Sequence, residues 1–218
     1  MSSVSFGQVP NWTETSCNTN SYTMHDELSA GNAVILDFGA VWCGPCQMTA
    51  PELEAVWQAF DQGNLGVKVF GFLIQDASIQ NTDCADVAAW DQGLNLTYPG
   101  FADCMDIYTD YDTQYNGGGA IPLILVFVPD QNNPGQSTLV YNYITGLGAS
   151  SGDISDDIMT VLADNGYWAL DIEEQTIDTN KELVMIVDLM GRETTFKANT
   201  PLIYIYNDGS RERVLKVQ

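Results

Sequence analysis

The stretch that decides the fold is Val34-Ile35-Leu36-Asp37-Phe38-Gly39-Ala40-Val41-Trp42-Cys43-Gly44-Pro45-Cys46. Its apolar first half is typical of a buried strand, and its two cysteines stand where a helix would begin. A C-x-x-C sequence at a first helical turn can open and close a disulfide, because backbone N–H groups and the helix dipole favour a thiolate there. Pro45 suits such a turn, since it needs no N–H partner. We therefore expect thiol–disulfide chemistry, with Cys43 as the exposed nucleophile and Cys46 as the shielded resolving thiol.

The other interpretation of these two cysteines is half of a zinc site. A structural zinc site needs a second pair of cysteines or histidines with ligand spacing. The remaining cysteines are Cys17, Cys84 and Cys104, which form no further C-x-x-C, and His25 is the only histidine. We therefore predict no metal and no cofactor.

An acidic residue, Asp37, lies inside the apolar run six residues before Cys43. Burying a carboxylate charge is costly, so burial should raise the pKa of Asp37. The alternative is an aspartate at a strand end that faces water, as most aspartates do.

The segment from Asp37 to Cys46 resembles the active-site segment of the thioredoxin family, and the match continues through Met48, Ala50 and Pro51. Downstream, the run Gly119-Ala120-Ile121-Pro122-Leu123-Ile124-Leu125-Val126-Phe127 resembles the family's cis-proline loop and the strand after it. The resemblance covers about residues 8–166. It implies an α/β fold, the thioredoxin-like three-layer sandwich with a mixed central sheet.

The resemblance also implies roles for individual residues. Cys43, Cys46 and Asp37 would be catalytic, with Asp37 assisting proton transfer at Cys46. The Ile121–Pro122 peptide bond would be cis and packed against the disulfide, where its backbone would bind an extended substrate segment. The residues implied to contact substrate are Trp42, Gly44, Pro45, Ile121 and Pro122. The plainer interpretation of Pro122 is a proline that merely begins a strand.

Two departures from the thioredoxin pattern bear on Asp37. Gly39 stands where thioredoxins often carry a tryptophan. The lysine usual on the next central strand is missing from 67–74, because Lys68 lies too early to replace it. Both departures leave the proton-transfer environment of Asp37, and the redox potential, open.

Five cysteines make an odd number, so one remains over if the others pair. Cys84 and Cys104 both lie in a predicted helical insert, 82–115, and could form a structural disulfide worth about 3 kcal/mol. Cys17 would then be the free thiol. Pairing itself cannot be deduced from a sequence.

Charge is distributed unevenly along the chain. Residues 1–180 carry a net charge of −23, with Lys68 as their only base, whereas residues 181–218 carry +1. Phosphate backbones require Lys and Arg, so the first part is unsuited to nucleic acid, and it is equally unsuited to anionic membrane surfaces. The acidity suits either a basic partner or a salty exterior. No run of eighteen apolar residues exists to span a membrane.

The chain beginning suggests export. Ser5 and Gly7 form the small-x-small pattern of a signal-peptidase site before Gln8, although the preceding charged and apolar regions are absent. We interpret residues 1–7 as the remnant of a signal peptide, the alternative being an ordinary disordered start.

A thioredoxin-like domain over 8–168 and a linker over 169–180 would follow. The elements expected in that domain are a helix at 26–31, a strand at 33–39, a helix at 44–60, a strand at 67–74, two helices in the insert, a hairpin from 122–128 and 138–144, and a helix at 153–164.

Residues 181–218 read as a small antiparallel β unit, in which Asp208-Gly209 favours a hairpin turn. The unit resembles the carboxy-terminal sorting domain of cargo for the type IX secretion system of Bacteroidetes. The matching segments are Asp188-Leu189-Met190-Gly191-Arg192-Glu193, Tyr204-Ile205-Tyr206-Asn207-Asp208-Gly209 and the basic end. That resemblance implies an export address read by secretion machinery. The alternative is an extra β element that packs on the main sheet.

The sequence therefore predicts an exported thiol–disulfide oxidoreductase of reductase type, located in the periplasm, at the cell surface or outside the cell. Its partners would be protein or peptide thiols and disulfides and an electron donor or acceptor that the sequence does not identify. Two alternatives stay open. One is a non-enzymatic binding module with a structural Cys43–Cys46 bridge, and the other is a thiol peroxidase, although the Pro-x-x-x-Thr-x-x-Cys arrangement of a peroxidatic cysteine is missing before Cys43.

Overall fold

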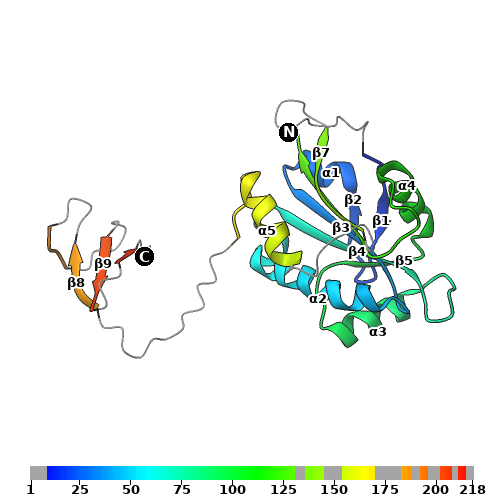
Figure 1. Ribbon diagram of the computed structural model, residues 1–218, viewed down its shortest axis with the longest axis horizontal. Helices are drawn as coiled ribbons and strands as arrows, with labels where there is room; N and C mark the ends of the chain where they lie inside the picture. The colour runs from blue at the N-terminus through cyan, green and yellow to red at the C-terminus, as the bar shows by residue number, and fades with distance from the viewer. Residues whose placement is uncertain are drawn as a thin grey trace. The chain divides into compact units, whose positions relative to one another are not determined.

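Two compact units, Met1–Asp171 and Ile172–Gln218, divide the chain in the computed structural model (Figure 1). The structure describes residues 9–130, 136–144, 154–169, 183–187, 192–195, 202–207 and 211–214. The predicted signal-peptide remnant, most of the predicted linker and the Asp188–Gly191 and Asp208–Ser210 segments of the tail lie outside those residues.

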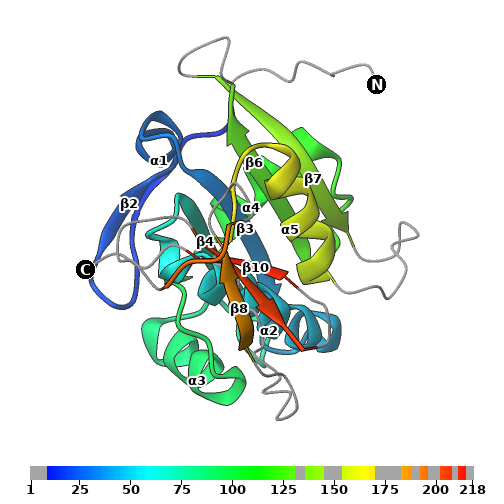
Figure 2. The same cartoon turned by 90° about the vertical axis from the view of Figure 1, so that its left-hand side faces the viewer.

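A five-stranded mixed sheet forms the centre of the first unit, in the order β5-β4-β3-β6-β7. Strands β3 (Ala33–Ala40), β4 (Val67–Gln75) and β5 (Gly100–Ala102) are parallel. Strands β6 (Leu123–Pro129) and β7 (Ser137–Ile144) continue the sheet antiparallel. Figure 2 shows this sheet from a second side. The mixed sheet confirms the predicted thioredoxin-like fold class.

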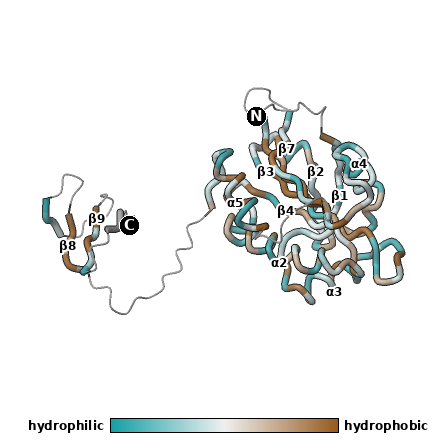
Figure 3. Tube along the Cα trace, in the orientation of Figure 1, coloured by the Kyte–Doolittle hydropathy of each residue, from teal (hydrophilic) through white to brown (hydrophobic). Residues whose placement is uncertain are grey.

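Helices cover both faces of this sheet. Successive side chains of β3 point to opposite faces and all are buried, so both faces must be covered. Val34, Leu36 and Phe38 join a core shared with α1 (Met24–Ser29) and α4 (Met105–Tyr115). Ala33 and Ile35 join a core shared with α2 (Gly44–Ala59) and α5 (Ile154–Asp164). Helix α3 (Cys84–Leu94) packs against α2 and β5. Coloured by hydropathy, the central strands stand out as apolar (Figure 3), as a sheet covered on both faces should.

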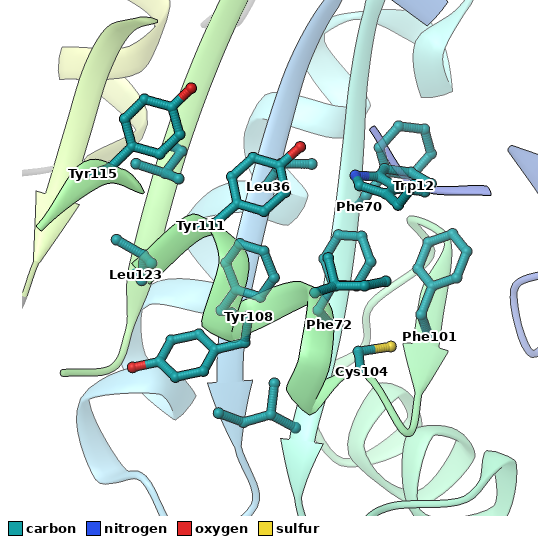
Figure 4. Packing of buried hydrophobic residues seen from close by; sticks show 14 of the residues in the cluster. Trp12, Leu36, Phe70, Phe72, Phe101, Cys104, Tyr108, Tyr111, Tyr115 and Leu123 are labelled. Carbon is teal, nitrogen blue, oxygen red and sulfur yellow. The ribbon is translucent and has the colours of Figure 1, made fainter. Parts of the chain in front are cut away.

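Aromatic rings fill the core on the α1 and α4 side (Figure 4). Trp12 meets Phe70, Phe72 and Phe101 edge-on, with ring centroids 5.3, 5.2 and 5.7 Å apart. Trp12 therefore anchors the segment before α1, residues 9–23, to this core. The hydroxyl of Tyr111 donates to the carbonyl of Pro10 at 2.7 Å, which ties α4 to the same segment.

Several short elements differ from the sequence prediction. The segment before α1 contains a hairpin of β1 (Thr13–Thr15) and β2 (Ser21–Thr23), and the first helix begins two residues earlier than expected. The helical insert also contains β5, which extends the sheet by one parallel strand. A three-residue strand at a sheet edge has too few residues to show a period, so the pattern of the insert indicated only helices. A 3-10 turn, η1 (Asp61–Gly63), follows α2.

The second unit is a three-stranded antiparallel sheet in the order β10-β9-β8. Its strands are β8 (Leu183–Val187), β9 (Leu202–Tyr206) and β10 (Arg211–Val214). The small antiparallel β unit predicted for the tail is therefore present.

Candidate active site

Cys43 and Cys46 form a disulfide at the start of α2, directly after β3. Cys43 is the N-cap residue, and its N–H donates to the carbonyl of Ala40 at 3.0 Å, which turns the chain from strand to helix. The N–H of Cys46 donates to the Cys43 sulfur at 3.1 Å. Negative charge on the Cys43 sulfur would thus meet a backbone donor and the positive end of a sixteen-residue helix.

Both sulfurs are shielded in this oxidised form. Cys43 is 3% exposed and Cys46 1% exposed. The expectation of an exposed Cys43 is therefore wrong for the disulfide state, since Cys43 packs in the aromatic core together with Cys46. What the surface presents beside them is apolar: Trp42 and Met48 are 49% and 68% exposed. The indole N–H of Trp42 donates to Gln75 at 3.2 Å, which holds the ring in place.

The loop before β6 lies against the disulfide. The Ile121–Pro122 peptide bond is cis, and the carbonyl oxygen of Ile121 is 3.8 Å from the Cys43 sulfur. Pro122 is buried and stands immediately before β6, so its missing N–H costs the sheet no hydrogen bond.

Asp112, a residue that the sequence did not single out, organises this loop. Its carboxylate accepts the N–H of Gly119 at 2.9 Å. A Cβ atom at Gly117 would collide with the same carboxylate, so a larger residue there would displace Asp112 from the loop. The glycine run at 117–119 was the feature of the sequence that could have indicated an unusual loop here, but no local pattern linked that run to an acidic residue on the preceding helix.

Asp37 is buried, with 6% of its surface exposed, so the alternative of a water-facing aspartate is wrong. The hydroxyl of Tyr98 donates to one carboxylate oxygen, Oδ2, at 3.3 Å. The other oxygen, Oδ1, has no hydrogen-bond partner among the described residues. Burial raises the pKa of Asp37 to about 7, and the Tyr98 hydrogen bond opposes part of that rise.

Gly39 lets Cys46 approach the strand that carries Asp37. The two strand residues are two positions apart, so both face α2. A Cβ atom at Gly39 would lie 3.2 Å from Cys46 Cβ and 3.5 Å from Cys46 Sγ. The residue that replaces the usual tryptophan therefore lets the active-site helix approach the strand beside the acid.

The predicted Cys84–Cys104 disulfide is wrong. Cys84 pairs instead with Cys17, and Cys104 is the free thiol. The N–H of Cys17 donates to the carbonyl of Gly100 at 2.9 Å, which places the end of the β1–β2 hairpin beside β5 and the start of α3. Cys104 lies instead among the core aromatics, where burial raises its thiol pKa (Figure 4).

The Cys17–Cys84 link joins residues 67 apart. On loop-entropy grounds, closing a loop of that length stabilises a fold by about 4 kcal/mol, within the usual range for a natural disulfide. We therefore interpret this disulfide as structural, since it holds the amino-terminal hairpin against the 82–115 insert.

No group of three or more His, Cys, Asp or Glu side chains suited to a metal ion occurs in the described part of the chain. Over the same residues, no helix combines the length and apolar character needed to cross a membrane.

Residues 7–132, more than half of the chain, match the sequence model of the AhpC/TSA family. The chain belongs to the AhpC/TSA family. A 31-residue segment is 55% identical to thioredoxins of Mycobacterium bovis and Mycobacterium tuberculosis, covering 14% of this chain and 27% of those proteins. A 42-residue segment is 48% identical to thioredoxin of Pseudomonas aeruginosa, covering 19% of this chain and 38% of that protein. The matches thus span well under half of these relatives.

Solved structures support the same fold for this AhpC/TSA member. A thiol:disulfide interchange protein of the thioredoxin family from Chlorobium tepidum superimposes with a TM-score of 0.54 at 17% identity, covering 74% of this chain and 99% of that one. The thioredoxin domain of a thiol-disulfide oxidoreductase from Bacteroides vulgatus gives 0.52 at 18% identity, covering 72% and 98%. A secreted disulfide oxidoreductase from Mycobacterium tuberculosis gives 0.50 at 17%, covering 70% and 95%. At such identities the likeness concerns the fold alone.

Proposed function

We propose that this AhpC/TSA family member is an exported thiol–disulfide oxidoreductase of reductase type that acts on protein or peptide disulfides. The observation that carries the proposal is the placement of the Cys43–Cys46 pair. Cys43 caps α2 and receives the N–H of Cys46, while Cys46 lies one turn inside the helix. One sulfur is thereby prepared to hold negative charge and the other to act second.

The first step joins protein and substrate. The Cys43 thiolate attacks one sulfur of the substrate disulfide, forming a mixed disulfide and releasing the other substrate sulfur as a thiolate. In this step the substrate docks on the apolar surface of Trp42, Gly44 and Pro45. An extended segment of the substrate pairs with the backbone at Ile121 and Pro122, where the Ile121 carbonyl is 3.8 Å from the Cys43 sulfur.

The second step releases the substrate. Asp37 takes the proton of the Cys46 thiol, and the Cys46 thiolate attacks Cys43 in the mixed disulfide. The Cys43–Cys46 bond forms, the second substrate sulfur leaves as a thiolate, and two electrons have passed from the protein to the substrate. An external dithiol must then reduce the protein. The pKa of Asp37, raised to about 7, suits a group that takes and returns a proton near neutral pH.

A redox titration tests the proposal. The purified protein is equilibrated in buffers of different redox potential. At each potential the free thiols are alkylated and identified by peptide mass mapping. We expect the Cys43–Cys46 pair to have a reduction potential of about −270 mV, as a reducing thioredoxin does. A value of about −180 to −120 mV would instead indicate an oxidase or isomerase.

The same experiment separates the other candidates. If Cys43–Cys46 stays bridged while Cys17–Cys84 opens, the pair is structural and the binding-module interpretation replaces the enzyme. A parallel assay follows hydrogen peroxide with the reduced protein, and rapid peroxide consumption would indicate a thiol peroxidase.

Export rests on separate support. A structural disulfide between Cys17 and Cys84 is typical of proteins in oxidising compartments. The sorting-domain resemblance falls on a tail that forms its own three-stranded sheet, separate in sequence from the redox residues. We propose that the tail is the export address and has no part in the redox chemistry.

The export proposal is tested in a Bacteroidetes host that has type IX secretion. The full chain, preceded by a signal peptide, is expected at the cell surface or in the medium, whereas the chain lacking residues 181–218 should stay in the periplasm. Equal distribution of the two forms would contradict the sorting role.

A further inference from the structure

A line of three residues crosses the sheet beside the active-site helix. Asp37 on β3 pairs in register with Gly71 on β4, and Gly71 pairs with Gly100 on β5. Neighbouring strands lie about 4.8 Å apart, so the line extends about 10 Å from Asp37 toward the β5 edge. The two glycines remove side chains from this line and leave space above the sheet.

Three side chains occupy the space that the glycines leave. A Cβ atom at Gly71 would come within 2.7 Å of the Tyr98 ring, so the ring lies directly over that strand. Its hydroxyl reaches Asp37. A Cβ atom at Gly100 would come within 2.6 Å of a Val87 methyl group and 3.5 Å of an Asp91 carboxylate oxygen, so both of these α3 side chains lie over the next strand.

A cavity of about 10 Å³ joins these groups, and its lining includes Asp37, Gly39, Asp91 and Tyr98. That volume holds about one water molecule. The partnerless oxygen of Asp37 gives such a water one acceptor, and the Asp91 carboxylate gives it another. Asp91 on α3 is only half-buried, so the far end of the line meets solvent.

We propose that the proton taken by Asp37 leaves the protein through this cavity by way of Asp91, and that Tyr98 is the positioning residue that fixes Asp37 for the transfer. The proposal rests on the proposed function. In each turnover the Cys46 thiol loses its proton to Asp37 as the Cys43–Cys46 bond forms. The proton then passes through a cavity water to the Asp91 carboxylate and from there to bulk water, which restores the Asp37 carboxylate.

The charges around Asp37 agree with this route. Tyr98, from the segment before β5, hydrogen-bonds Asp37, and Asp91 from α3 lines the same cavity, with the charge of Glu54 of α2 acting on Asp91. Cys46 of α2 lies against Gly39, two residues after Asp37 on the same strand. Burial and the nearby Glu54 charge raise the pKa of Asp91 to about 6, close to that of Asp37, so a proton moves between the two acids at little cost. Tyr98 remains protonated, because burial and the charge of Asp37 raise its pKa further.

The test compares the time at which the proton reaches the solution with the time at which Cys46 attacks the mixed disulfide. The reduced full chain is mixed with DTNB in weakly buffered solution at pH 8, together with a pH-indicator dye. The second thionitrobenzoate ion released reports the attack of Cys46, and this product stays ionised, so the dye reports only the protein's own proton. In the wild type both signals should rise together.

Asp91→Asn should leave the release of the second thionitrobenzoate at its normal rate and delay the proton by tenfold or more, whereas Asp91→Glu should restore simultaneous signals. Tyr98→Phe should shift the pH midpoint of that release upward by about half a unit, since the variant loses a hydrogen bond that lowers the Asp37 pKa. Asp110→Asn, the same charge change on the exposed side of α4, is the control and should alter nothing.

Simultaneous signals in Asp91→Asn, or equal slowing of both signals, would overturn the route. An unchanged pH midpoint in Tyr98→Phe would overturn the positioning role. Failure of the proposed function looks different: the wild type would then release one thionitrobenzoate and stop, with Cys43 left as an adduct.

Discussion

Replacing Cys46 by serine is expected to trap the protein on its substrate as a mixed disulfide through Cys43. Cys43 keeps its place as N-cap of α2, where backbone donors favour its thiolate, so the first attack still occurs. Serine cannot attack the mixed disulfide, so turnover of a disulfide substrate such as insulin should be lost. Non-reducing electrophoresis and mass mapping of the Cys46→Ser variant after incubation with insulin would measure the adduct, which should approach one per protein.

Two variants control this experiment. Cys43→Ser should form no adduct, because the remaining Cys46 lies one turn inside the helix and lacks the N-cap position that favours a thiolate at Cys43. Cys104→Ser should behave as the wild type, since that thiol is buried and donates to the Ala102 carbonyl at 2.9 Å. Adducts that map to Cys17, Cys84 or Cys104 would contradict the assignment of Cys43 as nucleophile.

Asp37→Asn should stabilise the oxidised protein at pH 8 by about 4 kcal/mol and leave its stability unchanged at pH 3.5. Burial raises the pKa of Asp37 from its ordinary value of 3.8 to about 7. Between these two values the folded protein binds a proton that the unfolded chain has released. The wild type therefore loses stability as pH rises through this window, and the loss levels off above pH 7.

Asparagine is neutral at every pH and can still accept the Tyr98 hydroxyl, so the variant lacks the cost of a buried charge. Urea unfolding of both proteins from pH 3.5 to 9 would measure the difference, which should grow steadily between about pH 4 and 7. Asp110→Asn is the matched control, because that carboxylate is exposed and its loss should produce no such slope. A constant difference across the pH range would show that Asp37 keeps its ordinary pKa.

The proposed function gives a reason for keeping so costly an acid. A carboxyl group that titrates near neutral pH can take the Cys46 proton and give it back, whereas asparagine cannot. The stability that Asp37→Asn gains should therefore be accompanied by slower resolution of the mixed disulfide, in line with the trade-off common at active sites.

Local pattern was enough to predict the central part of the molecule. The apolar run ending in C-x-x-C predicted β3, the start of α2 and the redox pair, because strand burial and helix capping act over a few residues. The same run predicted that Asp37 would be buried. The antiparallel tail unit also followed from periods of apolar residues and from turn signals, whereas the mixed sheet was implied by the resemblance to thioredoxins.

Contacts between distant residues could not be predicted in this way. Tyr98 reaches Asp37 across 61 positions of the chain, and Cys17 meets Cys84 across 67. The sequence indicated a Cys84–Cys104 pair because those residues are near neighbours along the chain. The fold instead turns Cys104 into the aromatic core and brings the amino-terminal hairpin to Cys84.

The sequence by itself thus determined which chemistry the chain can perform: two thiols three residues apart, at a helix start, after a buried strand that carries an acid. Only the tertiary structure decided the surroundings of that acid. Gly39, Gly71 and Gly100 form no recognisable pattern along the sequence. On adjacent strands, however, Gly71 and Gly100 leave room for Tyr98 and Asp91, which line one cavity, and Gly39 leaves room for Cys46. Parallel strands are joined by long crossovers, so side chains that line one cavity come from segments with no local signal in common.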